Sequence, residues 1–188
     1  MTTARAAPGA LAALRADFRA NAPELPAGGG ALAVARALAR NVPTVRFVAV
    51  AMLRLAQSAG TRVGPLGSLV KQANHVLTGA DIAYQAEIGP GLVLYHPTGV
   101  VIGPACRVGV RATIMQGVTL GSDEVVAGRD RAGSPTVGDD VFIGPGAAVF
   151  GSVELGDRVQ VGANAVVTSS FSSDVIVAGA PARVLRGR

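Results

Sequence analysis

Two histidines and one cysteine are the side chains of this 188-residue sequence best suited to proton transfer or nucleophilic attack. His96 stands in the segment YHPTG (95–99), where a regular six-residue pattern of aliphatic residues is interrupted, and Asp81 precedes it by 15 residues. A carboxylate that holds one imidazole nitrogen fixes the tautomer, and the other nitrogen can then take a proton from a hydroxyl. The pair therefore predicts general-base activation of an alcohol; the alternative is that both residues only cap turns.

The other reactive side chains have structural interpretations. His75 lies in a stretch with helical spacing, where a lone histidine is usually structural. Cys106 is the only cysteine, so no internal disulfide is possible, and it falls at a small-residue position of the repeat that predicts a core side chain. One cysteine and two histidines make no plausible soft-ligand cluster, so we predict no metal site.

A hexapeptide repeat must position these residues. From about residue 82 an aliphatic residue recurs every six positions and is usually followed by glycine, and the residue four places later is small or β-branched. The aliphatic positions are Ile82, Ile88, Leu94, Ile102, Val108, Ile114, Leu120, Val137, Ile143, Val149, Leu155, Val161 and Val167. The small or branched positions are Ala86, Thr98, Cys106, Ala112, Val118, Val141, Ala147, Val153, Val159 and Ala165.

This period predicts a β-helix. Six residues fit neither an α-helix nor an alternating strand, but they fit one short strand plus one turn. Three such units close a triangular coil of about 18 residues, with the aliphatic side chains stacked inside. Positions 81 and 96 would then lie on adjacent turns and nearly stack. The register breaks between Leu94 and Ile102 and again after Leu120, where the polar segment 121–135 is predicted to leave the coil as a loop.

The first 80 residues have a different pattern. Helical spacing predicts helices over 10–20, 31–41, 43–60 and 65–77, with Pro43 at a helix start and Gly60 and Gly79 at helix ends. The segment 23–30 is typical of a linker, and VLRGR (184–188) of a short basic tail. We therefore predict an N-terminal helical segment over 1–80 and a β-helix domain over 81–188.

Composition and charge exclude several classes of function. The net charge is +5, with about +7 in residues 1–80, but the arginines are spaced singly and no aromatic residues interleave with them. This favours a solvated helical face over nucleic-acid binding. The apolar stretch near 47–53 is too short to span a bilayer, and Arg15 and Asp17 interrupt the apolar run of a would-be signal peptide. We expect a cytoplasmic protein.

The segments 81–103 (DIAYQAEIGPGLVLYHPTGVVIG), 115–121 (MQGVTLG) and 178–184 (AGAPARV) resemble the serine O-acetyltransferases of the hexapeptide-repeat superfamily. The resemblance covers about residues 44–186. It implies a left-handed parallel β-helix and transfer of an acetyl group from acetyl-CoA to the hydroxyl of serine, a step of cysteine biosynthesis. It also implies a homotrimer or a dimer of trimers, with active sites between neighbouring β-helices. His96 matches the catalytic histidine of the family and Asp81 its partner aspartate.

The same resemblance implies which residues contact the cofactor, and it shows two places where this sequence departs from the family pattern. Gly144, Pro145 and Ala163 fall where backbone groups contact the pantetheine arm, and Arg183 lies near the CoA end. The family has an aspartate before the catalytic histidine, where this chain has Tyr95, and an Arg-His pair where it has Gly133 and Ser134. Arg129 or Arg131 could replace the lost carboxylate clamp.

We therefore predict an acetyl-CoA-dependent O-acetyltransferase that acts on L-serine or a serine-like small molecule, with His96 as general base. Two alternatives remain open. The acceptor could be a sugar, a polysaccharide precursor or a natural product, because only the pocket near Tyr95 and Ser134 would need to differ. The chain could also be a non-catalytic β-helix scaffold, although such a protein has no need of the Asp81/His96 pair.

Overall fold

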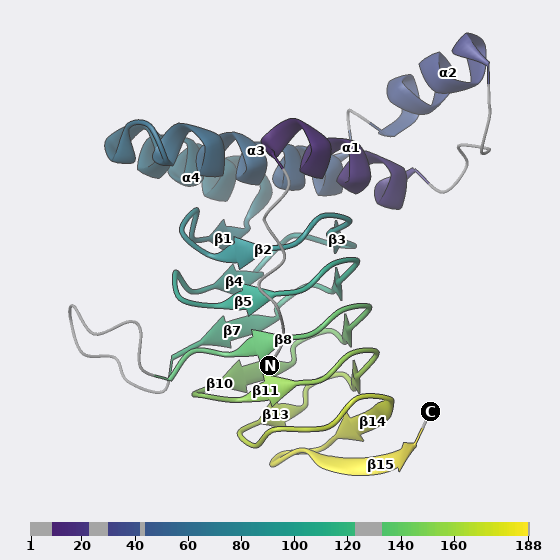
Figure 1. Ribbon diagram of the computed structural model, residues 1–188, viewed down its shortest axis with the longest axis vertical. Coiled ribbons are helices and arrows are strands. Elements are labelled where there is room, and N and C mark those ends of the chain that lie inside the picture. Colours follow the sequence, from purple (N-terminus) through teal and green to yellow (C-terminus); the bar gives the residue numbers. More distant parts are fainter. Residues whose placement is uncertain (1–8, 23–29, 42–43, 123–132, 188) are drawn as a thin grey trace.

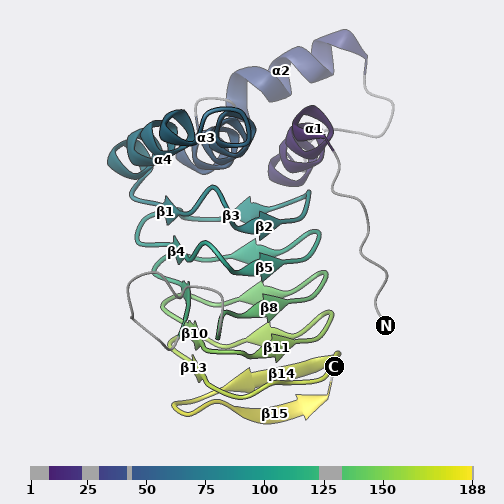
Figure 2. The ribbon, with the colours of Figure 1, turned by 60° about the vertical axis from the view of Figure 1, so that its left-hand side comes forward.

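In the part of the chain that the structure describes, three of four helices lie across one end of a three-sided column of short strands (Figure 1). The structure is a computed structural model that describes residues 9–22, 30–41, 44–122 and 133–187. The helices are α1 (Ala10–Asn21), α2 (Ala31–Asn41), α3 (Val45–Gly60) and α4 (Gly64–Thr78). Helix α3 packs on both α1 and α4, whereas α2 extends away from the column (Figure 2). Gly79 ends α4 in the left-handed conformation, at φ 75°, where a glycine avoids the steric cost of a Cβ.

The described strands form three sheets, one on each side of the column, and every pair is parallel except β14–β15. Sheet A has the order β1-β4-β7-β10-β13, sheet B the order β11-β8-β5-β2, and sheet C the order β15-β14-β12-β9-β6-β3. The prediction of a left-handed parallel β-helix with an N-terminal helical segment is confirmed. The strands are β1 (Asp81–Ile82), β2 (Glu87–Ile88), β3 (Val93–Leu94), β4 (Val101–Ile102), β5 (Arg107–Val108), β6 (Thr113–Ile114), β7 (Thr119–Gly121), β8 (Thr136–Val137), β9 (Phe142–Ile143), β10 (Ala148–Phe150), β11 (Glu154–Leu155), β12 (Gln160–Val161), β13 (Val166–Val167), β14 (Val175–Ala178) and β15 (Arg183–Gly187).

The core is a stack of aliphatic side chains in register. In sheet A the paired positions carry Ile82, Ile102, Leu120, Val149 and Val167, one above the other. All the aliphatic positions that the repeat predicts are buried. Removing this apolar surface from water is the main driving force for stacking the coils, because each short strand has no core of its own.

Thr98 is the one predicted inward position that is wrong, because its side chain is exposed. Asp81 pairs with Val101, so the first coil takes 20 residues instead of 18. The two extra residues are Tyr95 and His96, which form a bend directly after β3. Thr98 and Gly99 form a turn that stacks on the turn of Gln116 and Gly117 in the next coil, and Val100, which is fully buried, takes the inward position before β4.

The loop and the C-terminus differ in how much of them the structure describes. Strand β7 ends at Gly121 and β8 begins at Thr136, and most of the segment between them, 123–132, lies outside the described residues, as do residues 23–29 of the expected linker. The residues expected as a basic tail instead form β15, which pairs antiparallel to β14 and closes the lower end of sheet C.

Polar side chains tie the coils together along the edge between sheets B and C. Arg111, Asp140, Arg158 and Asp174 all have φ between 55° and 65°, a conformation that is costly for a residue with a Cβ. Arg111 bonds bidentately to Asp140, and Arg158 to Asp174, each across one coil-to-coil step. These ion pairs offset part of the conformational cost and raise the pKa of both arginines.

The helices close the upper end of the column by hydrogen bonding to its first coil. Backbone N–H groups of each coil mostly donate to carbonyls of the next, which leaves carbonyls of the first coil facing the helices. Arg54 of α3 donates to the carbonyls of Ile88 and Gly89, both at 2.7 Å. Its Nε also donates to Asp17 of α1 at 2.8 Å, and Asp17 in turn accepts the N–H groups of Gly91 and Leu92.

We expect Arg54→Met to lower the free energy of unfolding by about 3–5 kcal/mol, because it leaves the fully buried Asp17 carboxylate unpaired and two carbonyls without donors. Urea unfolding followed by circular dichroism measures this. Arg111→Met is the control, since its ion pair is exposed and should leave the midpoint nearly unchanged. Equal losses in both variants would contradict a capping role for Arg54.

Candidate functional site

His96 is exposed at the corner where β3 passes into β4, the edge between sheets C and A. The corner is fixed on both sides of the histidine. Leu94 is fully buried before it and Pro97 is buried after it. The turn that follows is held by Gly99 N–H donating to the Gly79 carbonyl at 2.9 Å and Gly117 N–H donating to Thr98 at 3.1 Å. The interrupted repeat thus presents His96 to solvent from a rigid backbone.

Asp81 begins β1 in sheet A and is partly buried. Among the described residues, its carboxylate forms an ion pair with the ammonium group of Lys71 on α4 and no hydrogen bond with His96. The catalytic pairing of Asp81 with His96 therefore stays a prediction. The sequence offered no signal for Lys71, because its contact depends on how α4 enters the coil.

Tyr95 and Arg46 form the wall beside His96. The Tyr95 ring is half exposed and packs edge-to-face against the imidazole, with ring centroids 5.4 Å apart. The Arg46 guanidinium of α3 lies over the Tyr95 ring, 5.6 Å from its centroid, and donates to the Asn21 carbonyl at 2.6 Å. Sequence reasoning identified Tyr95 but missed Arg46, because the two are 49 residues apart and no repeat links them.

The predicted cofactor residues lie on the same edge as His96, in lower coils. Gly144 and Pro145 form the corner between β9 and β10, and Ala163 the corner between β12 and β13. Backbone hydrogen bonds join these corners in a column: Gly146 N–H donates to Gln116, and Asn164 N–H to Pro145. A Cβ at Gly144 would lie 2.8 Å from the Ala163 nitrogen, so the close approach of the corners requires glycine.

The remaining predicted residues lie elsewhere. Arg183 begins β15 at the lower end of the column and is exposed. Ser134 lies just before β8, at the edge between sheets A and B, so one chain does not bring it beside His96. Arg129 and Arg131 lie outside the described residues.

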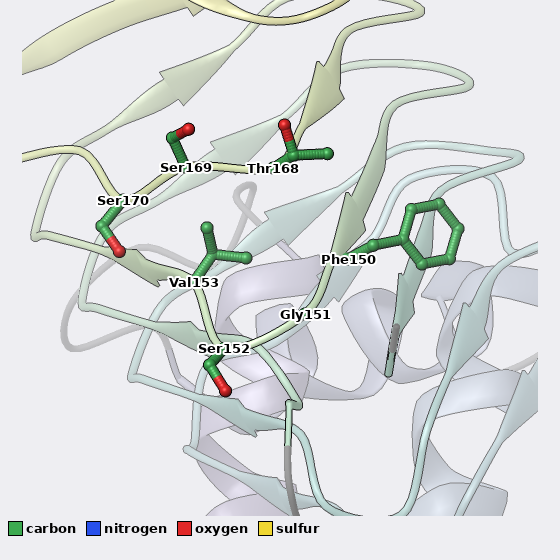
Figure 3. A pocket seen from close by; sticks show the side chains of 7 residues that line it. All are labelled: Phe150, Gly151, Ser152, Val153, Thr168, Ser169 and Ser170. Atoms are coloured by element: carbon green, nitrogen blue, oxygen red, sulfur yellow. The ribbon is translucent and has the colours of Figure 1, made fainter. Parts of the chain in front are cut away.

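An open cavity of about 310 Å³ lies on the edge between sheets A and B (Figure 3). Its lining comes from two segments, Phe150 to Val153 and Thr168 to Ser170, and includes four hydroxyl-bearing side chains. Ser170 Oγ accepts a hydrogen bond from the Glu154 N–H at 2.9 Å. The cavity shares its edge with Ser134 and not with His96.

Three other features bear on the chemistry. His75 is exposed on α4, and its carbonyl accepts the Gly79 N–H. Within the described ranges, no three His, Cys, Asp or Glu residues gather as a metal site would require. No helix in that part of the chain is long and apolar enough to cross a membrane.

Two hexapeptide families match the β-helix. Bacterial transferase hexapeptide (six repeats) matches residues 134–169, and the hexapeptide repeat of succinyl-transferase matches residues 99–128. A serine acetyltransferase of Mycobacterium tuberculosis is 42% identical over 120 residues, which are 64% of this chain and 51% of the relative. The chain thus spans about half the length of the curated relatives that it matches.

Solved serine acetyltransferases have the same fold. The enzyme of Neisseria gonorrhoeae in complex with serine is 26% identical with a TM-score of 0.78, and the match covers 94% of this chain and 69% of that one. A serine acetyltransferase in complex with CoA is 27% identical with a TM-score of 0.79, covering 95% of this chain and 70% of that one.

Cys106 is buried, and burial raises the pKa of its thiol to about 11, while a backbone hydrogen bond from Gly103 lowers it slightly. A raised pKa keeps the thiol neutral, so only about one molecule in a thousand holds a thiolate at pH 8. We expect iodoacetamide at pH 8 to leave Cys106 unmodified by intact-protein mass spectrometry and to modify it fully in urea. Labelling of the folded protein at the rate of a free cysteine would contradict this.

Proposed function

We propose that this chain is a serine acetyltransferase-like protein of the hexapeptide-repeat superfamily, and that it transfers an acetyl group from acetyl-CoA to the hydroxyl of L-serine or a serine-like small molecule. The observation that carries the proposal is the single edge between sheets C and A. That edge presents an exposed histidine, His96, at its head and the corners of Gly144 and Ala163 below it.

His96 is the general base of this proposal. One imidazole nitrogen takes the proton of the acceptor hydroxyl as its oxygen attacks the thioester carbonyl. The carbon–sulfur bond breaks, and the departing CoA sulfur takes the proton back from the imidazolium. No acyl-enzyme is needed, and the neutral, buried Cys106 is unsuited to form one.

Asp81 is proposed to orient the imidazole. In this structure the carboxylate pairs with Lys71, so the proposal requires that Asp81 turn from Lys71 to the imidazole. The orienting contact would fix the tautomer of His96 and stabilise the imidazolium that forms during transfer.

The pantetheine arm of acetyl-CoA is proposed to follow the same edge toward Arg183. Ala163 is exposed at its corner, and among the described residues its backbone N–H has no hydrogen-bond partner. An unpaired donor of this kind suits an amide carbonyl of pantetheine. The solved relative in complex with CoA supports a CoA site in this fold.

A homotrimer, alone or as a pair of trimers, is part of the proposal. His96 and Ser134 lie on different edges of one column, so a site that combines these two residues needs a neighbouring copy. We place the active site between two copies for this reason.

A sugar or natural-product acceptor remains the second candidate. The specific observation in its favour is Tyr95, a neutral ring beside His96 where the resembled family has a carboxylate.

We expect His96→Ala to lower the turnover number for L-serine by about 10²–10⁴-fold, because the hydroxyl loses its base. Asp81→Asn should lower it less, since it removes orientation but not the base. Release of CoA thiol from acetyl-CoA measures both. His75→Ala is the matched control, and its turnover number should equal that of the unchanged protein. A folded His96→Ala protein with undiminished turnover would overturn the mechanism.

A further inference from the structure

Arg46 differs in its partners from the arginines of this chain that form ion pairs. Arg54, Arg107, Arg111 and Arg158 each pair with a carboxylate. Within the described residues, Arg46 instead has a backbone carbonyl and an aromatic ring as its partners. A guanidinium carries five N–H donors, and the Asn21 carbonyl engages one of them. Its charge and most of its donors thus remain available.

The position of Arg46 is fixed beside the proposed base. The ring of Tyr95 contacts both groups: its centroid lies 5.6 Å from Arg46 Cζ and 5.4 Å from the centroid of the His96 ring. Stacking on an aromatic face and bonding to a carbonyl restrict the rotamers of an arginine. A cation that is already ordered loses less entropy when it binds an anion.

We propose that Arg46 binds an anionic group of the acceptor, so that the site selects alcohols that carry a carboxylate or a phosphate over neutral ones. This inference rests on the proposed acetyl transfer at His96. A planar guanidinium binds either anion through two parallel hydrogen bonds. The Tyr95 ring, which is neutral, offers no competing charge. Arg46 would be a specificity residue that touches the acceptor and not a participant in proton transfer.

Two matched pairs of acceptors test the inference in the full-length protein. L-serine and L-serinamide differ in the carboxylate, and glycerol 3-phosphate and glycerol differ in the phosphate. We expect the unchanged protein to prefer the anionic member of at least one pair by about tenfold or more in kcat/KM. The pair that shows the preference tells a carboxylate from a phosphate acceptor.

Arg46→Gln should reduce that preference to about threefold or less, because it keeps an N–H donor for Asn21 and removes the charge. The effect should fall on KM for the anionic acceptor and leave KM for acetyl-CoA unchanged, which separates it from a general distortion of the corner. Arg46→Lys should restore part of the preference. Arg62→Gln, which removes an exposed arginine after the end of α3, is the matched control and should change nothing.

The outcomes separate this inference from the proposed function. Turnover without preference for either anion, a preference that survives in Arg46→Gln, or an equal rise of KM for acetyl-CoA would overturn the role of Arg46 alone. Absence of turnover by the unchanged protein with all four acceptors would overturn both proposals.

Discussion

The unpaired backbone groups at the end of a β-helix are the constraint on which this structure depends. A stack of coils satisfies its own hydrogen bonds everywhere except at its first and last turn, where exposed edges would also invite pairing with other chains. Here the last turn is closed by the β14–β15 hairpin and the first by helices. Arg54 reaches two carbonyls, and the fully buried Asp17 both neutralises it and accepts two N–H groups. A buried ion pair is costly to desolvate, and these additional hydrogen bonds are what make it tolerable.

The same cap places the proposed site. Asn21 of α1 donates to the Leu92 carbonyl at 2.9 Å, immediately before β3, the strand that leads into His96. Helix α3 carries Arg54 on the cap and Arg46, eight residues earlier, on the Tyr95 ring. Capping and site geometry therefore share one rigid helix. A change that loosens α3 from the first coil would move Arg46 and the His96 corner together.

The repeat made most of the column predictable, because burial of one aliphatic residue per strand leaves its trace in the sequence at a fixed period. The helices were predictable for the same reason, at a different period. Thr98 was misplaced because a count from Leu94 cannot show that the two extra residues of the lengthened coil, Tyr95 and His96, come before the regular turn. Lys71 and Arg46 escaped prediction because their contacts join a helix to a corner, and such contacts depend on the docking angle of the helix and not on any local pattern.

A column of this shape also limits what one chain can do alone. Its edges are convex, and a convex edge can present a base but cannot surround a substrate or exclude water from it. The one cavity identified in the described part of the chain is open and lies on a different edge from His96. An enclosed site at His96 therefore needs a second surface, and the edge that carries Ser134 is one that a neighbouring copy could bring there. In that arrangement Arg46 and Tyr95 form the wall contributed by the same chain as the base. Acceptor selection would thus be set partly within each chain, and the interface would supply enclosure.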